Sequence, residues 1–485
     1  MHPHGFEESM SDQSRRPSFG RDSVWLASAD VVAVLLAFVG QLILARALLS
    51  ESYGLFVIAI DLFATLFLLL DLGLPTLLAR DGPRNPSAIW PGMLRIYRLQ
   101  GLVMLLFAPI AVWVVITQSA HDTLMLLGAG VALVHIASYA PRTALRAAGD
   151  ARFESLTKVI ERIVTTIGYG ILFWLASTDV VAYATVFLIG AIVGLLLALI
   201  GAYRICGNSD ERLESSALGS AWVTNKSSLL AARPRAITLG VMPYVIRIEK
   251  FILASELGYD EVALFHVAQL AWLAGLLIPQ AMRSALLPVL GASRNDTARF
   301  DQHLDRVERI CFGLVPIGLV AGAAIVWILL PLGFPTEYFD GTLGASARDV
   351  FMLLLIGWAM PVLSVPSYTA LQAGERPWLF TLLIFTVVLS STVFGLFLIG
   401  RGAETSTGLA IEMAAYASIA SSFVMLMGGI VLSRRFSAFM QRGIQWCATL
   451  LLVVVACVAL SQQSYWALSG LGLFILLPQG LEAMK

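Results

Sequence analysis

Two cationic side chains lie in the middle of a predicted apolar helix over residues 236–257. Arg247 and Lys250 are three residues apart, so they share one face of this helix. An ionisable group inside a membrane span costs roughly 2.5–3.5 kcal/mol on insertion scales, which makes each one a functional candidate. Two cations at one depth suit a pyrophosphate, which accepts hydrogen bonds from more than one donor. The alternative is that either cation pairs with Glu249, or with an acid on another helix, and fixes helix packing.

A polar stripe is predicted on a second span, which begins near Leu124. Four side chains share one face of this helix: His135, Tyr139, Arg142 and Arg146. The equivalent positions in the second half of the chain are uncharged, which favours a path for a pyrophosphate along the first half. Arg142 and Arg146 could instead mark the cytoplasmic end of the span. His135 could equally be a packed, hydrogen-bonded histidine.

Two acidic side chains are candidates for coupling transport to an ion gradient. Glu249 lies in the same span as the two central cations, about 200° around the helix from Arg247. Asp61 is predicted about two turns below the outer surface. A carboxyl group in a low-dielectric site can bind and release a proton near neutral pH. Asp61 could equally be the ion-pair partner of Arg46 or Arg247.

Two neutral polar side chains complete the candidate binding residues. His266 and Gln269 are three residues apart in the span that begins near Val262, and Gln280 falls near the same face. Imidazole and amide groups can hydrogen-bond sugar hydroxyls. The same groups also hold helices together inside membranes, so both interpretations stay open.

Motifs for catalysis, metal binding and cofactor binding are absent from the sequence. It contains no GxSxG, HExxH or Walker motif and no paired-carboxylate motif. The four cysteines are scattered without a CxxC spacing, at Cys206, Cys311, Cys447 and Cys457. We therefore expect a protein that is not an enzyme, with no cofactor, no metal and no nucleic-acid partner.

Composition places these residues in an integral membrane protein of helices. The chain is 58% hydrophobic and 13% charged, with a mean hydropathy of +0.81, against about 45–50% and about 25% in soluble domains. A span needs about 20 mostly apolar residues, and the sequence predicts about 14 transmembrane helices. Their predicted starts are Val24, Tyr53, Leu99, Leu124, Leu156, Val180, Ala236, Val262, Ile310, Val350, Leu379, Gly408, Ile444 and Tyr465. Twelve spans with a membrane-associated tail are the alternative.

Two internal matches indicate a repeated architecture. Residues 44–59 align without gaps to residues 253–268 with six identities, and 143–150 align to 369–375 with one deletion. Membrane transporters built from repeats usually bind substrate between the repeats. We expect two six-helix lobes and an extra helix pair. The predicted boundaries are a polar tail over 1–23, lobes over 24–205 and 236–432, a cytoplasmic linker over 206–235, and the helix pair over 443–478.

Basic residues predict the orientation of the chain in the membrane. With the N-terminus inside, 27 of the 32 Lys and Arg residues fall in cytoplasmic segments. Such a bias is the usual mark of the cytoplasmic side. Both termini are therefore predicted in the cytoplasm.

Short motifs resemble a known transporter family, the polysaccharide-export (Wzx-type) flippases of the MOP superfamily, which are related to the MATE exporters. The motifs are LARAL at 44–48, YGLF at 53–56, DLGL at 71–74, Arg80, and Arg247-Ile248-Glu249 where that branch tends to show Arg-x-Asp. The resemblance implies a MATE-like fold in the inner membrane. It also implies alternating access that carries an undecaprenyl-pyrophosphate-linked oligosaccharide to the outer leaflet, for lipopolysaccharide or other surface polysaccharide biosynthesis. Implied partners are this lipid-linked oligosaccharide, membrane lipid, and polysaccharide polymerase or export machinery.

Two other functions are the alternatives. A MATE-type exporter of small amphipathic cations would favour an acidic cavity, whereas this sequence places Arg142, Arg247 and Lys250 in its spans. A membrane glycosyltransferase or polymerase resembles the chain in helix count. Those enzymes usually carry acidic motifs in an outer loop, and the first outer loop here is predicted to be only Ser50-Glu51-Ser52.

Overall fold

The computed structural model describes residues 19–68, 71, 73–84, 86–117, 119–207, 234, 237–238, 240–294, 296–374 and 376–435. These residues form α-helices and short 3-10 turns, and no strand occurs among them. Ten helical segments of this part of the chain are long and apolar enough to cross a membrane. The prediction of an all-α, multi-pass membrane protein is thus confirmed. The predicted helix pair over 443–478 and residues 1–18 of the polar tail lie outside the described residues.

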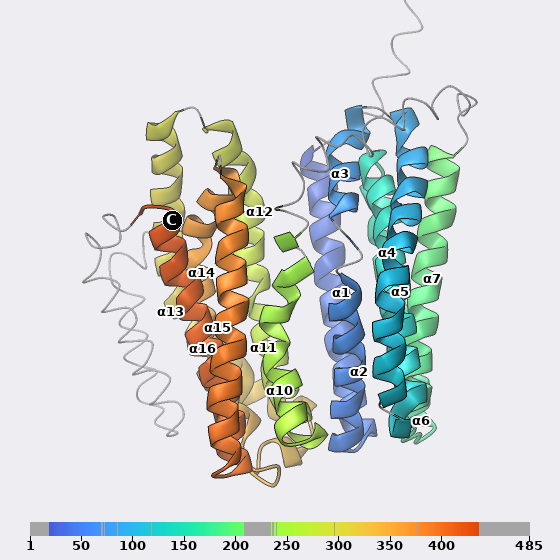
Figure 1. The fold of residues 1–485 in the computed structure, drawn as a ribbon, viewed down its shortest axis with the longest axis vertical. Helices are drawn as coiled ribbons and strands as arrows, with labels where there is room; N and C mark the ends of the chain where they lie inside the picture. Colours follow the sequence, from blue (N-terminus) through green and yellow to red (C-terminus); the bar gives the residue numbers. More distant parts are fainter. Residues whose placement is uncertain are drawn as a thin grey trace, which may run out of the picture. The chain divides into compact units, whose positions relative to one another are not determined.

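The chain divides into two compact units, Met1–Ala47 with Leu62–Gly240, and Leu48–Asp61 with Val241–Lys485. The helices of the first unit are coloured blue to green in Figure 1. They are α1 (Phe19–Ala47), α3 (Leu74–Asp81), α4 (Ile89–Thr117), α5 (Asp122–Ala147), α6 (Ala151–Trp174) and α7 (Val180–Cys206). Helix α2 (Ser50–Leu68) begins in the second unit, and its last turns belong to the first.

Helices α5 and α6 hold the core of the first unit. Helix α5 packs against α3, α4 and α7, and α6 packs against α1 and α7. Asp150 caps the start of α6 by accepting a hydrogen bond from the backbone amide of Phe153 at 3.0 Å, which fixes the turn after α5. Gly190 and Gly194 let α7 approach α6 closely, because a Cβ atom at either position would clash with α6 side chains.

The second unit is built around one buried helix. Its other helices are η6 (Met242–Ile246), α10 (Ile248–Glu256), α11 (Tyr259–Gly275), α12 (Leu277–Ala292), α13 (Thr297–Gly333), η7 (Thr336–Tyr338), α15 (Pro377–Ala403) and α16 (Thr407–Leu432). Helix α14 (Ala347–Ala373) packs against α11, α12, α13, α15 and α16. Of the residues in an apolar 18-residue stretch of α14, 83% are buried. An apolar helix with neighbours on every side is the core of such a bundle.

The sequence predicts one helix over 236–257 with a kink at Pro243, and the structure shows an interruption there. A 3-10 turn, η6, occupies Met242–Ile246, and α10 starts only at Ile248. Pro243 lies at the start of η6, where its missing N–H prevents a regular α-helical hydrogen bond. Arg247 is the junction between the two pieces, with φ −125° and ψ −19°. A broken helix within a membrane protein is tolerated where it lines a cavity or contacts other protein.

The two segments of the longer internal match contact each other inside the second unit. The Ser50 hydroxyl donates a hydrogen bond to the Asp260 carboxylate. Gly54 lies against the backbone carbonyl of Tyr259, and a Cβ atom there would clash with this oxygen. The glycine of the YGLF motif is therefore required by a close helix approach.

Candidate functional site

The central cations of the broken helix share one carboxylate. The Arg247 Nε atom lies 3.0 Å from Oδ1 of Asp61, and the Lys250 ammonium donates to Oδ2 of the same side chain. Asp61 comes from α2 and is mostly buried, as is Lys250. Of the alternatives open from the sequence, the structure shows pairing with an acid on another helix, and Asp61 is the partner of Arg247.

His266 completes this group, which we name the Asp61 cluster: Asp61, Arg247, Lys250 and His266. The His266 Nδ1 atom lies 3.5 Å from the Lys250 ammonium. Because the ammonium carries only donors, Nδ1 acts as the acceptor and the ring proton sits on Nε2. The Nε2 atom is buried and has no hydrogen-bond partner among the described residues. The ring packs edge-on against Tyr53, 5.8 Å between centroids.

Glu249 lies apart from the neighbouring cations. Its Oε1 atom accepts a hydrogen bond from the Ser391 hydroxyl at 2.7 Å, and its side chain is fully buried. Its Oε2 atom has no hydrogen-bond partner in the described part of the chain. A buried carboxyl group held by a hydroxyl rather than by a cation is suited to binding a proton.

Gln269 supports the broken helix. Its Nε2 atom donates a hydrogen bond of 2.9 Å to the backbone carbonyl of Ile246, at the end of η6. This carbonyl lies where the helix is interrupted, so the side chain supplies a hydrogen bond there. The Gln269 Oε1 atom is buried without a partner among the described residues. The contact thus matches the helix-holding interpretation of Gln269.

In the first unit, the buried Glu161 of α6 contacts two residues of the predicted stripe on α5. The Arg142 guanidinium donates to Glu161 Oε2 at 2.5 Å, and His135 Nε2 lies 3.0 Å from Oε1. We name His135, Arg142 and Glu161 the Glu161 cluster. Both carboxylate oxygens are occupied and Glu161 is 3% exposed, so the group is a compact buried ion pair.

A second glutamate of α6, Glu154, forms an ion pair with Arg146, the other arginine of the predicted stripe. Arg146 makes a two-pronged contact with Glu154, with Nε 2.8 Å from Oε2 and a second guanidinium nitrogen on Oε1. Lys158 lies 3.4 Å from Glu154 and 3.1 Å from Asp30 of α1. We name these four residues the Glu154 cluster. Tyr139, the fourth stripe residue, is 39% exposed.

Sequence reasoning missed Glu154 and Glu161, although a signal was present. Arg146 lies four residues before Asp150, and Glu154 lies four residues after Asp150. Glu161 follows Glu154 by seven residues, just as Arg142 follows His135 by seven. Two oppositely charged stripes that mirror each other across a tight turn predict ion pairing between the two helices.

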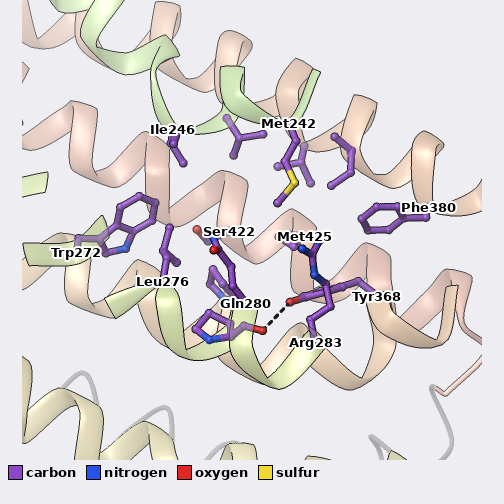
Figure 2. Close-up of a pocket in the computed structure, with 15 residues that line it drawn as sticks. Met242, Ile246, Trp272, Leu276, Gln280, Arg283, Tyr368, Phe380, Ser422 and Met425 are labelled. Carbon is purple, nitrogen blue, oxygen red and sulfur yellow. Dashed lines mark hydrogen bonds between the residues drawn. The ribbon is translucent and has the colours of Figure 1, made fainter. Parts of the chain in front are cut away.

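An apolar pocket lies within the second unit, with a volume of about 100 Å³. Its walls come from η6, α11, α12, α14, α15 and α16, and Figure 2 shows the side chains that line it. Polar groups on its lining are few: Trp272, Gln280, Arg283, Tyr368 and Ser422. A mostly apolar lining with a small set of polar groups is typical of a ligand site. Gln280, which the sequence places near the face of His266 and Gln269, lines this pocket, whereas His266 and Gln269 themselves do not.

Solved structures with a similar fold are transporters. The chain superimposes on an inward-facing MATE multidrug transporter of the MOP superfamily with a TM-score of 0.63 and 16% identity, covering 84% of this chain and 96% of that one. A MATE in complex with MaL6 superimposes with a TM-score of 0.61 and 15% identity, covering 87% of this chain and 96% of that one. A third similar structure is a MOP superfamily transporter from Pyrococcus furiosus, whose binding pocket is described as having reverse polarity. It superimposes with a TM-score of 0.60 and 16% identity, covering 87% of this chain and 95% of that one. At these identities the likeness shows the fold.

Family membership rests on sequence. A comparison with curated protein sequences gave no match. A family model described as polysaccharide biosynthesis protein matches residues 19–292, more than half of the chain. This match agrees with the motifs of the first half, and the fold agrees with the MOP superfamily. The chain belongs to the polysaccharide biosynthesis protein family, and its fold is that of MATE transporters of the MOP superfamily.

Proposed function

We propose that this protein is a flippase that moves a polyprenyl (undecaprenyl) pyrophosphate-linked oligosaccharide across the cytoplasmic membrane by alternating access. The observation that carries this proposal is the family match over residues 19–292 in a chain with a transporter fold. A protein of polysaccharide biosynthesis that is built as a transporter requires a sugar substrate at the membrane. A lipid-linked oligosaccharide is that kind of substrate, and it supplies surface polysaccharide.

The Asp61 cluster is the proposed binding site for the pyrophosphate. Arg247 and Lys250 already hold one anionic group, the carboxylate of Asp61. A pyrophosphate offers more oxygen acceptors than a carboxylate and can replace it on both cations. Such an exchange avoids leaving a bare charge in the membrane, where an unpaired ion is far too costly. Asp61 is then the resident counter-ion of the empty site.

Glu249 is the proposed ion-coupling residue. It is fully buried and hydrogen-bonded to Ser391, and no cation contacts it among the described residues. A carboxyl group in this setting can change protonation as access alternates. In contrast, Arg142 and Arg146 each contact a buried glutamate. These contacts favour a structural role for both arginines.

The test of the function is a gene deletion in the host. The deletion strain should accumulate a lipid-linked oligosaccharide, identified by mass spectrometry, and the wild-type gene should remove it. Arg247→Ala should fail to complement at normal expression, whereas Arg299→Ala should complement. Arg299 is a matched control because its side chain is 76% exposed. A MATE-type cation exporter would tolerate the loss of Arg247 and would leave the lipid-linked intermediates unchanged.

The proposed location is the inner membrane with both termini in the cytoplasm. The cationic bias of the predicted loops supports this orientation. In a cysteine-free background, Ser87→Cys should react with a membrane-impermeant reagent only in inverted vesicles. Thr178→Cys should react in intact cells. Labelling of Ser87→Cys from outside would overturn the orientation.

A further inference from the structure

The pocket of Figure 2 contains an arginine without a carboxylate. Arg283 of α12 makes no hydrogen bond or ion pair within the described residues, and its side chain is partly buried. Arg142, Arg146, Arg247 and Lys250 each contact an acidic side chain. A partly buried cation that faces an apolar cavity is stabilised by binding an anion there.

Two of the polar residues on the pocket lining, Arg283 and Trp272, can only donate hydrogen bonds. The indole Nε1 of Trp272 can only donate, and it is buried without a partner among the described residues. Tyr368 already uses its hydroxyl, which lies 3.5 Å from the carbonyl of Pro279. No carboxylate lines the pocket. This donor set fits an anionic ligand and disfavours a cation.

The walls of the pocket fit a branched hydrocarbon chain. Aromatic, aliphatic and methionine side chains make up most of the lining, among them Met242, Phe380, Ile384 and Met425. Methionine adapts to irregular apolar shapes because its chain is flexible and polarizable. One wall is η6, the broken part of the helix. Interrupted helices in transporters commonly mark ligand sites.

We propose that this pocket binds the isoprenoid phosphate end of the lipid carrier. The isoprenoid chain lies against the apolar walls, and the phosphate oxygens accept hydrogen bonds from Arg283. This inference rests on the proposed flippase function for the identity of the carrier. It adds an anion site to the Asp61 cluster, the proposed pyrophosphate site, and this second site also recognises the isoprenoid chain.

The experiment measures binding of radiolabelled geranylgeranyl phosphate to the purified full-length protein in detergent. Arg283→Gln should weaken binding roughly 10- to 100-fold, because a charge-assisted hydrogen bond to the phosphate is lost. Arg283→Lys should recover part of the affinity, and Arg309→Gln on α13 is the matched control. Binding of the neutral alcohol geranylgeraniol should not change in Arg283→Gln. Ile384→Trp, which fills the pocket, should weaken binding of both ligands.

Three outcomes would overturn the pocket assignment. These are equal affinity of wild type and Arg283→Gln for geranylgeranyl phosphate, displacement of the probe by inorganic phosphate alone, and equal displacement by dioleoyl phosphatidate. Gel filtration and thermal unfolding of each variant exclude misfolding as the cause of a loss. The two proposals fail separately. Arg283-dependent binding without accumulation in the deletion strain refutes only the flippase, and accumulation without Arg283-dependent binding refutes only the pocket.

Discussion

The two units treat similar pairs of cations differently. In the first unit, Arg142 and Arg146 contact two different glutamates, and Lys158 contacts an aspartate as well. In the second unit, Arg247 and Lys250 share the single carboxylate of Asp61. Spacings of four and three residues put each pair on one helix face. The spacing of the cations is therefore nearly the same in the two units, but the number of acidic side chains that they contact differs.

This difference separates charges that hold the fold from charges that can bind substrate. Where each cation has its own buried carboxylate, removal of either partner leaves an uncompensated charge and destabilises the protein. Where two cations share one carboxylate, an incoming dianion can replace the acid and match the charge better. We therefore propose that the Glu161 and Glu154 clusters stabilise the fold and that the Asp61 cluster binds substrate.

The largest effect is expected when the Glu161 cluster is broken. Arg142→Ala removes the guanidinium that contacts the buried Glu161 carboxylate, and it should lower the free energy of unfolding by about 3–5 kcal/mol. The double variant Arg142→Met with Glu161→Met should recover most of this loss, because a buried ion pair can be replaced by apolar groups. Denaturant unfolding in detergent measures both. A fully stable Arg142→Ala protein that cannot transport would make Arg142 a substrate residue instead.

Substitutions in the Asp61 cluster are expected to cause a large loss of transport rather than of stability. Arg247→Ala should reduce flipping at least about 30-fold, since a buried charged contact is worth about 2–5 kcal/mol. Arg247→Lys should restore only part, because the planar fork that binds two phosphate oxygens is lost. Stability should change little, because Lys250 still contacts Asp61. Flipping is followed in proteoliposomes, and full complementation by both Arg247→Ala and Lys250→Ala would refute the phosphate site.

A third test separates the two acids of the second unit. Glu249→Gln keeps the side-chain shape and the Ser391 contact but cannot carry a proton. Transport driven by an ion gradient should fall to the rate seen without a gradient, while substrate binding is kept. Asp61→Asn should alter substrate binding through its two cations. If both variants keep the wild-type dependence on proton and sodium gradients, neither acid couples transport.

The smallest effect is expected for an acid outside the spans. Burial raises the pKa of Asp71 to about 6, and its Oδ1 atom has no partner among the described residues. Because the folded state binds the proton more tightly than the unfolded one, this group stabilises the protein most below about pH 4. That contribution, about 2–3 kcal/mol, is lost as the pH rises toward 6. Asp71→Asn should flatten this part of the stability curve, and an unchanged curve would contradict the assignment.

Much of the fold could be predicted because membrane insertion imposes simple rules on the chain. Each of the ten described segments that are long and apolar enough to cross the hydrocarbon overlaps a span predicted from apolar runs between charged breaks. The interruption at Met242–Ile246 was not located, although Pro243 marked the place of a kink. Whether a proline bends a helix or breaks it depends on which neighbours satisfy the freed backbone groups. Here Gln269 of α11 does so.

The sequence predicted the cations of the candidate site, but it did not predict which acidic side chains they contact. Arg247 and Lys250 stood out because charged residues are rare in apolar runs. Glu161 was overlooked because it lies among other charged residues near the predicted start of its helix. The pocket with Arg283 left no local signal, since its walls come from six elements spread from Met242 to Met425.

The sequence by itself determined that this is a helical membrane protein with a repeated segment, and which helix faces carry charge. These properties follow from composition and from the period of the helix, which are local. Only the tertiary structure decided the partner of each charge. Asp61 and Lys250 are 189 residues apart in the chain, and their contact depends on how α2 and α10 are rotated and packed. No periodicity within either segment encodes that rotation, so the distinction between a structural pair and a binding pair is a property of the folded protein.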